Sequence, residues 1–331
     1  MARKLIFLTG GTGFLGHHLL PVLLECGYDL RFLVRPTTDI GWLKGRNVQI
    51  AYGDVTDAQS VQAGMAGCDY VVHAAGHFRF WGPEEVFYQV NEYGTEVVCD
   101  AALAHGIERF VHISTIVVVG EPPPGAFIDE DAPLNPQDHY QKSKVAGEAV
   151  IARKVAEGLP AVILRPGAFY GPYGRYAFNR LFIEEPLRGW RVQVDSGRRY
   201  TFPVYAPDVA RAAHLAIQFG RVGEIYNICG RSITHLALNR MVSELLGITP
   251  WRLNVPSQLM ILLAWLMEFA AKLTRREPFY PINLRHYVFN DWQVRSAKAR
   301  LELGFEPTDL EAGLQKTIAW YRDIFAKGAR L

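Results

Sequence analysis

A glycine-rich segment near the N-terminus, TGGTGFLG at residues 9–16, limits the possible folds more than any other feature of the sequence. It follows the strand-like run KLIFLTG and precedes a helix-like stretch over residues 14–26. Glycines at such a junction allow a close backbone approach, so a pyrophosphate can bind the free N–H groups where the helix begins. A glycine-rich turn without a ligand is the alternative, but the strand before and the helix after make the motif specific. The predicted dinucleotide contacts are Gly10, Thr12, Gly13, Phe14, Leu15 and Gly16.

The first half of the chain alternates apolar runs with helix-like segments. The apolar runs are nearly continuous, as strands buried on both faces require. Strands are expected near residues 4–10, 30–34, 48–53, 70–76, 109–115 and 161–167, and helices near 14–26, 57–66, 84–105 and 139–157. This βαβα order predicts an α/β fold of Rossmann type, a doubly wound parallel sheet with right-handed crossovers and helices on both faces.

The pattern loosens after Pro166, where glycine and proline become frequent in RPGAFYGPYGR. We expect residues 1–165 to form the dinucleotide-binding domain and residues 166–331 to form mainly a smaller substrate-binding lobe. Two later stretches, residues 204–214 and 224–230, are regular enough to return to the main sheet. Residues 204–230 are therefore assigned to the first domain, and the two lobes are predicted to interleave.

The end of the second expected strand indicates which dinucleotide binds. Dinucleotide sites place a discriminating residue about 20 positions after the glycines, acidic for a ribose 2′-OH and arginine for a 2′-phosphate. Arg35 lies at this position, and a guanidinium can hold a phosphate through two parallel hydrogen bonds. NADP(H) is therefore predicted rather than NAD(H). Asp54, after the third strand, can accept hydrogen bonds from an adenine amino group; its alternative role is to cap the next helix, which Asp57 could also do.

Tyr140 and Lys144 stand four residues apart in HYQKSK, and of the fifteen tyrosines only Tyr140 has a lysine at this distance. On a helix, residues four apart share a face and can present a phenol and an ammonium to one point. Spacing alone is not decisive, because on the order of one such pair is expected by chance in a chain of this size.

The motifs, taken in order, resemble those of extended short-chain dehydrogenase/reductases of the NAD-dependent epimerase/dehydratase type. They are TGGTGFLG (9–16), GDV (53–55), VVHAAG (71–76), VNEYGT (90–95), HISTIVVVG (112–120), YQKSK (140–144), RPGAFYGP (165–172), the aspartate of YAPDVARA (205–212) and YNICG (226–230). LVRPTTD, FRFWGPEE and the C-terminal SAKARLELGFEPTDLEAGLQKTIAWYR are most similar to the dihydroflavonol-4-reductase-like group and to hopanoid-associated sugar-epimerase-type proteins.

The resemblance implies a role for each member of the YxxxK motif. Tyr140 would be the general acid/base, Lys144 would bind the nicotinamide ribose and lower the pKa of the phenol, and Thr115 would orient the reacting carbonyl or hydroxyl, with Ser114 as the alternative. Asn91 has either a proton-relay or a structural role. Further cofactor contacts implied by the matched motifs are Val55, Ala74, Ala75 and Pro166.

The reaction is expected to be a reduction. Dehydratases of this type carry an acidic pair just after the Ser/Thr, whereas Thr115 is followed by IVVVG. The loop HFRFWGPEE lies where ligands bind in open α/β sheets, so we expect an aromatic or apolar substrate face, with packing between lobes as the alternative reading. The candidate substrate residues are His77, Phe78, Trp81, Phe169 and Tyr170, with Tyr173 as a further wall.

The leading hypothesis is an NADP(H)-dependent oxidoreductase that reduces a ketone or aldehyde, or oxidises the alcohol, on a hydrophobic or aromatic small molecule. One alternative is an epimerase or dehydrogenase acting on a sugar or sugar nucleotide, whose phosphate Arg175, Arg198 or Arg199 could meet. A second alternative is a dinucleotide-sensing protein without catalysis. Intact Thr115, Tyr140 and Lys144 count against the sensor.

Charge and cysteine content limit the partners and the compartment. The formal net charge of +2 disfavours nucleic acid. The four scattered cysteines suggest no metal site and a cytoplasmic, reducing compartment. No secretory signal or transmembrane segment is expected. The apolar stretch 258–276 is expected to be a buried or pocket-lining helix, with weak contact to a membrane surface as the alternative, which the trailing Arg275 and Arg276 favour. A homodimer is implied by the resemblance alone.

Overall fold

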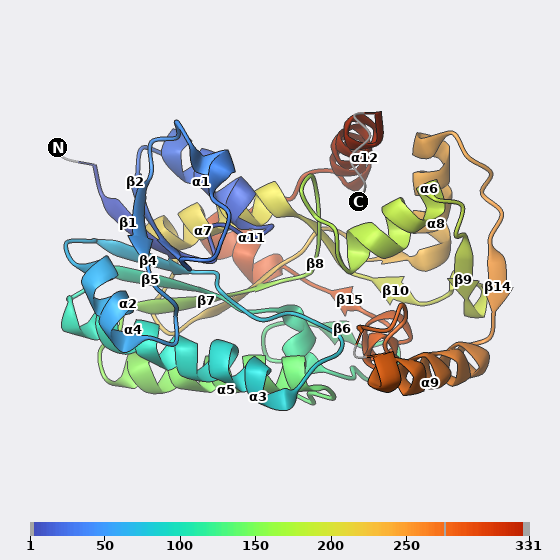
Figure 1. The fold of residues 1–331 in the computed structure, drawn as a ribbon, viewed down its shortest axis with the longest axis horizontal. Coiled ribbons are helices and arrows are strands. Elements are labelled where there is room, and N and C mark those ends of the chain that lie inside the picture. The colour runs from blue at the N-terminus through green and yellow to red at the C-terminus, as the bar shows by residue number, and fades with distance from the viewer. Residues whose placement is uncertain (1–2, 275, 327–331) are drawn as a thin grey trace.

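The computed structural model describes residues 3–274 and 276–326. Its centre is a seven-stranded sheet in the order β12-β7-β5-β4-β1-β2-β3, in which every neighbouring pair is parallel (Figure 1). The strands are β1 (Leu5–Thr9), β2 (Asp29–Val34), β3 (Gln49–Tyr52), β4 (Tyr70–His73), β5 (Arg109–Ile113), β7 (Ala161–Pro166) and β12 (Ile225–Ile228). The predicted parallel α/β sheet is confirmed.

Helices cover both faces of this sheet. One face carries α1 (Gly16–Glu25), α7 (Ala206–Phe219) and α11 (Ala297–Leu303), and the other carries α2 (Ala58–Met65), α4 (Gly94–Ala104) and α5 (His139–Ala156). Successive residues of β1 serve the two layers, because Ile6 and Leu8 pack in the first core while Phe7 packs in the second. This double burial explains the continuous apolar runs of the strands.

The helix expected over residues 84–105 is one continuous rod with a widened turn. It consists of α3 (Glu84–Tyr88), a π-helical turn (Gln89–Tyr93) and α4. The π-helical turn carries Asn91, whose side chain is buried. Such turns are often found at functional sites.

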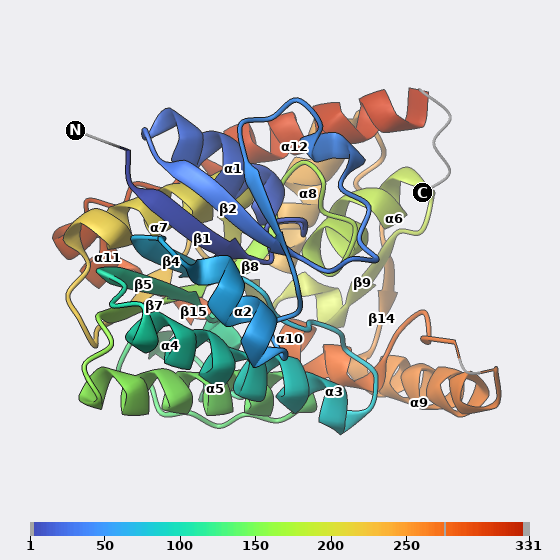
Figure 2. The ribbon, with the colours of Figure 1, turned by 60° about the vertical axis from the view of Figure 1, so that its left-hand side comes forward.

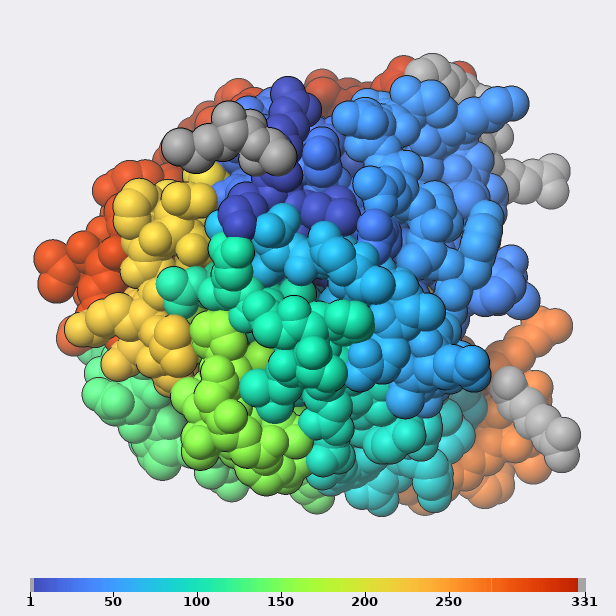
Figure 3. Space-filling model, turned by 90° about the vertical axis from the view of Figure 1, so that its left-hand side faces the viewer, coloured from blue at the N-terminus to red at the C-terminus, as the bar shows by residue number. Residues whose placement is uncertain are grey.

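Segments far apart in sequence are joined throughout the molecule. Strand β12 follows β7 by about sixty residues yet completes the main sheet beside it. The stretch 204–214, expected to return to the main sheet, contributes to two places. Strand β11 (Pro203–Tyr205) pairs with β8 (Ala168–Tyr170) outside the main sheet, whereas α7 packs on β5 and β7 of the main sheet. Figure 3 shows one end of the molecule, where the yellow and red-orange segments near residues 206–224 and 300 lie beside blue and green segments of the first half.

The remaining elements extend beyond the carboxyl ends of the strands, on the right of Figure 1. Helix α8 (His235–Leu246) packs against α12 (Leu310–Ala326), while short strand pairs join β9 (Val192–Val194) to β14 (Leu253–Val255), β10 (Tyr200–Thr201) to β13 (Ile233–Thr234) and β6 (Phe127–Ile128) to β15 (Gln293–Val294). The short helices α6 (Glu185–Leu187) and α10 (Arg285–Val288) lie in the same part.

Helix α9 (Ser257–Thr274) lies at the edge of this part, away from the sheet (Figures 1 and 2). Within the described residues it is the one helix whose length and hydropathy would suffice to cross a membrane, and only 17% of it is buried. The expectation of a buried helix at residues 258–276 is therefore wrong. A single stripe of the helix packs against the protein, and the rest faces outward.

Candidate active site

The glycine-rich loop is shaped for a close backbone approach. Gly10 has φ +72°, and a Cβ added there would lie 2.6 Å from the backbone of Ala74 and Ala75 at the end of β4. A Cβ on Gly16 would lie 1.9 Å from the Gly11 carbonyl oxygen, so this glycine lets α1 begin directly against the loop. No side chain caps α1 at Leu15, which leaves the helix N-terminus suited to an anion. The loop therefore fits the pyrophosphate of a dinucleotide.

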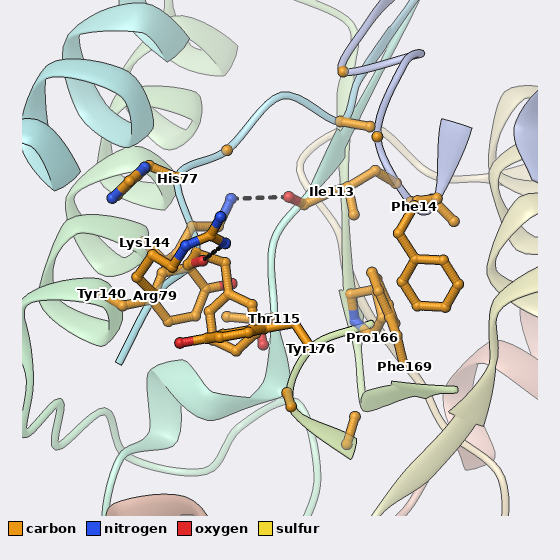
Figure 4. A pocket seen from close by; sticks show the side chains of 18 of the residues that line it. Phe14, His77, Arg79, Ile113, Thr115, Tyr140, Lys144, Pro166, Phe169 and Tyr176 are labelled. Atoms are coloured by element: carbon orange, nitrogen blue, oxygen red, sulfur yellow. Dashed lines mark hydrogen bonds between the residues drawn. The ribbon is translucent and has the colours of Figure 1, made fainter. Parts of the chain in front are cut away.

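A cavity of about 700 Å³ extends from this loop along the carboxyl ends of the central strands (Figure 4). Residues from both halves of the chain line it, from the glycine-rich loop to α10. The cavity brings together most of the predicted site residues: Gly10, Thr12, Gly13, Phe14, Leu15, Arg35, Asp54, Val55, Ala74, Ala75, His77, Phe78, Thr115, Tyr140, Lys144, Pro166 and Phe169.

Four predicted residues do not line this cavity. Tyr173, expected as a further wall, instead stacks on His17 with ring centroids 4.5 Å apart. Gly16 packs against the backbone of Gly11 and serves the loop's shape. Residues 76–80 of its loop line the cavity, but Trp81 itself does not. Tyr170 is 1% exposed, and its ring packs against Phe178 and Tyr205 in the hydrophobic core below β8. Tyr170 therefore supports the fold, and the prediction that it faces the substrate is wrong.

The residues that follow β2 and β3 form one end of the cavity, where the adenosine of a dinucleotide is predicted to bind. The side chain of Arg35 is exposed at the cavity rim, next to Thr38. Asp54 Oδ1 accepts hydrogen bonds from the Thr56 backbone N–H at 3.0 Å and from the Thr56 hydroxyl at 2.8 Å. The N-cap of α2 is Asp57, which accepts from Gln59 N–H, so Asp54 is not needed for that role.

Tyr140, Thr115 and Lys144 converge at the middle of the cavity. Thr115 lies two residues after the end of β5, and its side chain forms a hydrogen bond with the phenol of Tyr140 in the first turn of α5. Lys144, one turn further along α5, donates from Nζ to the Ile113 carbonyl at 2.9 Å (Figure 4). Asp138 caps α5 by accepting from Gln141 N–H at 2.8 Å, which fixes the start of the helix.

Burial controls the protonation of both titratable groups. The Tyr140 ring is partly accessible within the cavity, yet protein surrounds it closely enough that burial raises the pKa of the phenol well above its ordinary value. The hydrogen bond from Thr115 opposes this rise, and the charge of Asp138 adds to it. Burial lowers the pKa of Lys144 to about 8, against the opposing charge of Glu148. Desolvation dominates the pKa of the phenol, and the lowering by Lys144 that the resemblance implies stays a prediction.

The hydroxyl of Ser114 is engaged elsewhere. It donates to Glu148 Oε1 at 2.5 Å, and Arg165 binds the same carboxylate through Nε at 2.9 Å and Nη2 at 2.6 Å. This network is buried between β5, α5 and β7. Thr115, rather than Ser114, is therefore the hydroxyl residue that contacts Tyr140.

Asn91 fixes the backbone of the loop that carries His77. Its Oδ1 accepts from His77 N–H at 2.7 Å, while its Nδ2 donates to the His77 carbonyl at 3.1 Å and to Ser143 Oγ at 2.9 Å. Both donations of its Nδ2 are used to hold protein groups in place, which favours the structural of its two expected roles.

Two buried histidines lie beneath Lys144. His73 on β4 and His112 on β5 are paired in register with ring centroids 5.3 Å apart. His112 Nε2 is 3.4 Å from Lys144 Nζ, and His73 is held between the hydroxyls of Thr9 and Thr95. Burial lowers the pKa of both imidazoles, that of His73 to about 3, so both are neutral.

The aromatic wall opposite Thr115 was only partly anticipated. Phe78 lies 4.6 Å from the Tyr140 ring, and Tyr176 stacks on Phe80 at 5.2 Å. The phenol of Tyr176 also accepts from Phe80 N–H at 3.1 Å. The aromatic content of GPYGRYAF was a signal for Tyr176, whereas Leu284, Tyr287 and Val288 reach the cavity from the C-terminal part and had no local signal.

No cluster of His, Cys, Asp or Glu suited to a metal ion occurs among residues 3–274 and 276–326. Of the three arginines considered for a phosphate, Arg175 lines the cavity. Arg199 instead pairs with Asp291 at 2.8 Å, and Arg198 donates to the Asp195 carbonyl.

Proteins similar to this chain in sequence include a ketoreductase and a sugar-nucleotide dehydratase. Sterol demethylase protein B of Methylococcus capsulatus is 29% identical, covering 95% of this chain and 97% of its own length. A dTDP-glucose 4,6-dehydratase of Streptomyces niveus is 32% identical, with 96% and 93% covered. The 4-hydroxy-2-methyl-3-oxo-4-farnesyl-3,4-dihydroquinoline-1-oxide ketoreductase of Stigmatella aurantiaca is 29% identical, with 90% and 91% covered.

A solved structure has the same overall fold. The crystal structure of a dTDP-glucose 4,6-dehydratase from Streptomyces venezuelae with NAD bound superposes with a TM-score of 0.80 at 25% identity, covering 98% of each chain. A dihydroflavonol 4-reductase-type protein of Synechocystis is 27% identical, with 96% of this chain and 94% of its own length covered. The model of the NAD dependent epimerase/dehydratase family matches residues 6–229. The chain therefore belongs to the NAD dependent epimerase/dehydratase family, the extended short-chain dehydrogenase/reductases, as its motifs predicted.

Proposed function

We propose that this protein is an NADP(H)-dependent reductase of a ketone or aldehyde carried by a lipophilic small molecule. The observation that carries the proposal is the chemistry around Tyr140. Its phenol meets a wall of aromatic and aliphatic side chains, and the carboxylate that lines the cavity within the described residues is Asp54, at the adenosine end. Elimination of water needs an acid and a base beside the substrate, whereas carbonyl reduction needs one proton donor.

The chain's own residues suit proton donation. A nicotinamide dinucleotide bound along the glycine-rich loop would supply the hydride. Tyr140 holds its proton at neutral pH, because burial raises the pKa of the phenol, and can donate it to the carbonyl oxygen. Thr115 donates a hydrogen bond that stabilises the phenolate left behind and can orient the same oxygen. Lys144, held by the Ile113 carbonyl, adds positive charge one helical turn away.

The substrate class is supported by the cavity wall and by two relatives. Phe78, Phe80, Phe169, Tyr176 and Leu284 give the wall its apolar character. The relatives named as a farnesyl-dihydroquinoline oxide ketoreductase and as sterol demethylase protein B carry lipophilic compounds in their names. A lipophilic carbonyl compound is therefore favoured over a free sugar.

The proposed preference for NADP(H) rests on Arg35 at the rim after β2. Titration of the ligand-free protein with NADP⁺ and NAD⁺ tests it directly. We expect tighter binding of NADP⁺, and Arg35→Gln should weaken NADP⁺ by about tenfold or more while changing NAD⁺ little, since the lost contact is to the 2′-phosphate. Equal affinities in the unmodified protein would refute the assignment.

A sugar-nucleotide epimerase or dehydrogenase is the second candidate, favoured by Arg79 and Arg175 in the cavity lining. Cations at these positions could meet a diphosphate. One assay separates the two: NADPH oxidation is followed with a panel of aromatic and alkyl ketones and aldehydes, and NAD(P)⁺-dependent conversion is followed with nucleoside-diphosphate sugars. We expect turnover in the first panel only.

The same assay tests the catalytic role of Tyr140. Tyr140→Phe should reduce turnover by roughly a thousandfold or more while leaving dinucleotide affinity nearly unchanged, because the hydroxyl is the proton donor. Persistent turnover in that variant would disprove the mechanism. Tight dinucleotide binding without turnover of any compound would instead support the sensor reading.

Assembly and compartment follow the family resemblance. A homodimer through the outer faces of α4 and α5 is proposed, and light scattering of the purified protein measures it. Cys26, Cys68, Cys99 and Cys229 are free thiols, which suits a reducing cytoplasm.

A further inference from the structure

The outward face of α9 is apolar, which reverses the usual pattern of a surface helix. We name the α9 outer face by the residues Leu259, Leu262, Leu266, Phe269 and Leu273. Phe269 is 60% exposed and Leu273 is 76% exposed. On a helix that covers a soluble core, polar residues occupy the side facing water. Here the side facing away from the protein carries leucine and phenylalanine, with exposed Trp265 beside them.

A different stripe of α9 already holds the helix on the protein. Met260, Ala264 and Ala271 are buried, and between them Glu268 accepts a hydrogen bond from Ile282 N–H at 2.8 Å. These residues lie about four apart and share one face. The packing of α9 is therefore satisfied without its outer face, which is left for a partner.

We propose that the α9 outer face docks on the surface of an anionic phospholipid bilayer, with the helix lying in the plane of the membrane interface. The helix is 18 residues long, or about 27 Å at the rise of an α-helix, slightly less than the hydrocarbon core. One side of it is packed on protein through Glu268 and the small residues. A helix with one apolar face outward and one face held by its own protein suits an interfacial position rather than a span.

The charges next to the α9 outer face favour an anionic surface over a second copy of the chain. Lys272 and Arg276 are exposed, and neither pairs with a carboxylate in the described part of the chain; Arg275 lies outside the described residues. Across residues 268–277 the sequence carries Lys272, Arg275 and Arg276 against Glu268 and Glu277, a formal net charge of +1. Glu268 belongs to the packed side of α9, where it accepts from Ile282 N–H, and Glu277 accepts from the Tyr176 hydroxyl at 2.6 Å. The excess charge is therefore positive and can interact with lipid phosphates.

Exposed aromatic side chains lie at the segment that follows α9. Trp190 is 64% exposed and lies 6.2 Å from the ring of Phe279, which follows the helix. The guanidinium of Arg180 lies over the same phenylalanine. Tryptophan and phenylalanine beside arginine are typical of segments that insert among lipid headgroups.

The chain that leaves α9 becomes part of the cavity wall. Glu277 holds Tyr176, Asn283 donates to the Phe80 carbonyl at 3.1 Å, and Leu284 and Tyr287 line the cavity. Docking of α9 would thus place the aromatic wall next to the phase in which a lipophilic carbonyl compound dissolves. This last consequence rests on the proposed reductase function, whereas the docking does not.

The test uses the full chain and two kinds of vesicle, phosphatidylcholine alone and phosphatidylcholine with phosphatidylglycerol, in a sedimentation assay at low salt. We expect binding to the anionic vesicles. The triple variant Leu262→Gln/Leu266→Gln/Phe269→Gln should lower the partition coefficient on the order of a hundredfold. Lys272→Glu should lower it by about tenfold. The matched controls Leu301→Gln and Lys316→Glu, at exposed positions on other helices, should bind like the unmodified protein.

Three results would overturn the docking. They are no binding of the unmodified protein to anionic vesicles, equal binding to both vesicle types, and undiminished binding of the triple variant. Light scattering on the same samples detects the competing occupant: a dimer that becomes a monomer in the triple variant, without vesicle binding, would assign the α9 outer face to a second copy. Because no turnover is measured, failure of the reductase proposal leaves the vesicle result unaffected.

Discussion

Thr115 follows strand β5, and its hydroxyl forms a hydrogen bond with the phenol of Tyr140. The spacing of the motifs predicted this residue, but the choice between Thr115 and Ser114 needed the structure, because only the fold reveals that Ser114 bonds Glu148. Tyr170 and Tyr176 illustrate the same limit. They lie on one glycine-rich segment with similar neighbours, yet backbone direction turns Tyr170 into the core and Tyr176 into the cavity wall. Residue type was predictable and direction was not.

Substitution of Thr115 separates the hydroxyl from the shape of the side chain. Thr115→Ser should retain most activity, because the hydroxyl that binds the Tyr140 phenol remains. Thr115→Val should lower kcat by roughly a hundredfold with little change in dinucleotide affinity. Steady-state kinetics with a ketone substrate and titration with NADP⁺ provide the two readouts. A valine variant as active as the unmodified enzyme would remove Thr115 from the mechanism.

Lys144 gives a pH dependence of stability with a definite sign. Its pKa falls from 10.5 in the unfolded chain to about 8 in the folded protein, so between these values the unfolded state binds more protons. The contribution of Lys144 to the free energy of unfolding therefore rises as pH increases from 8 to 10, by at most about 3 kcal/mol. Urea unfolding of the unmodified protein and of Lys144→Met at about pH 7.5, 8.5 and 9.5 measures how the difference in unfolding free energy between the two proteins changes across this window. A difference between the two proteins that stays constant would contradict the burial of a charged lysine.

Helix α5 carries both Tyr140 and Lys144, so the cap at its start controls the geometry of the site. Asp138 caps this helix and also accepts from the Tyr287 hydroxyl at 2.7 Å, which links α5 to α10. An aspartate directly before a helix is a typical cap, so this role of Asp138 can be predicted from the sequence. The link to Tyr287 joins residues 149 positions apart, and no local pattern indicates it.

Removal of this cap should affect activity and stability together. Asp138→Ala should lower the free energy of unfolding by about 1 kcal/mol and reduce kcat, since the first turn of α5 loses its hydrogen bond. Asp138→Asn should keep most of both, because an amide oxygen can still accept from Gln141 N–H. Tyr287→Phe isolates the link to α10. Chemical unfolding and steady-state kinetics measure the pair of effects, and a stable, fully active alanine variant would refute the role of the cap.

The elements of the main sheet were predictable because burial on both faces leaves a continuous apolar run. The small strand pairs beyond it were not. Strands β8 and β11 are three residues each, and Ala168 pairs with Pro203 across a long intervening segment, so no local repeating pattern marks them. The prediction that α9 is buried failed for a related reason. Composition shows that a segment is apolar, but it does not show whether other parts of the protein cover that segment.

Across the whole molecule, buried imidazoles should make the fold sensitive to acid. Burial lowers the pKa of His73 to about 3, of His235 to about 4 and of His112 well below its ordinary value. The unfolded chain therefore binds more protons below pH 6.5, and stability falls as pH decreases from there toward 4. Each of these histidines contributes on the order of 1.4 kcal/mol per pH unit in that range.

Urea unfolding between neutral pH and about pH 5 tests this, since that interval lies inside the window set by the unfolded and folded pKa values. His235→Gln should reduce the slope of the unfolding free energy against pH, because burial lowers the pKa of this imidazole in the folded protein. A slope that His235→Gln does not alter would show that His235 is protonated in the folded protein.

The position of β12 at one edge of the main sheet affects how the protein is made. During synthesis, the ribosome releases the glycine-rich loop and β1 to β7 long before residues 225–228 emerge. Until then β7 has no partner strand on its outer edge. Helix α7, which packs on β5 and β7, is completed only a few residues before β12. An exposed parallel edge is a site for mispairing with other chains. A ribosome that stalls between residues 166 and 225 would thus leave a nascent sheet that depends on chaperones, and a gene truncated in this interval should yield aggregate rather than a free nucleotide-binding domain.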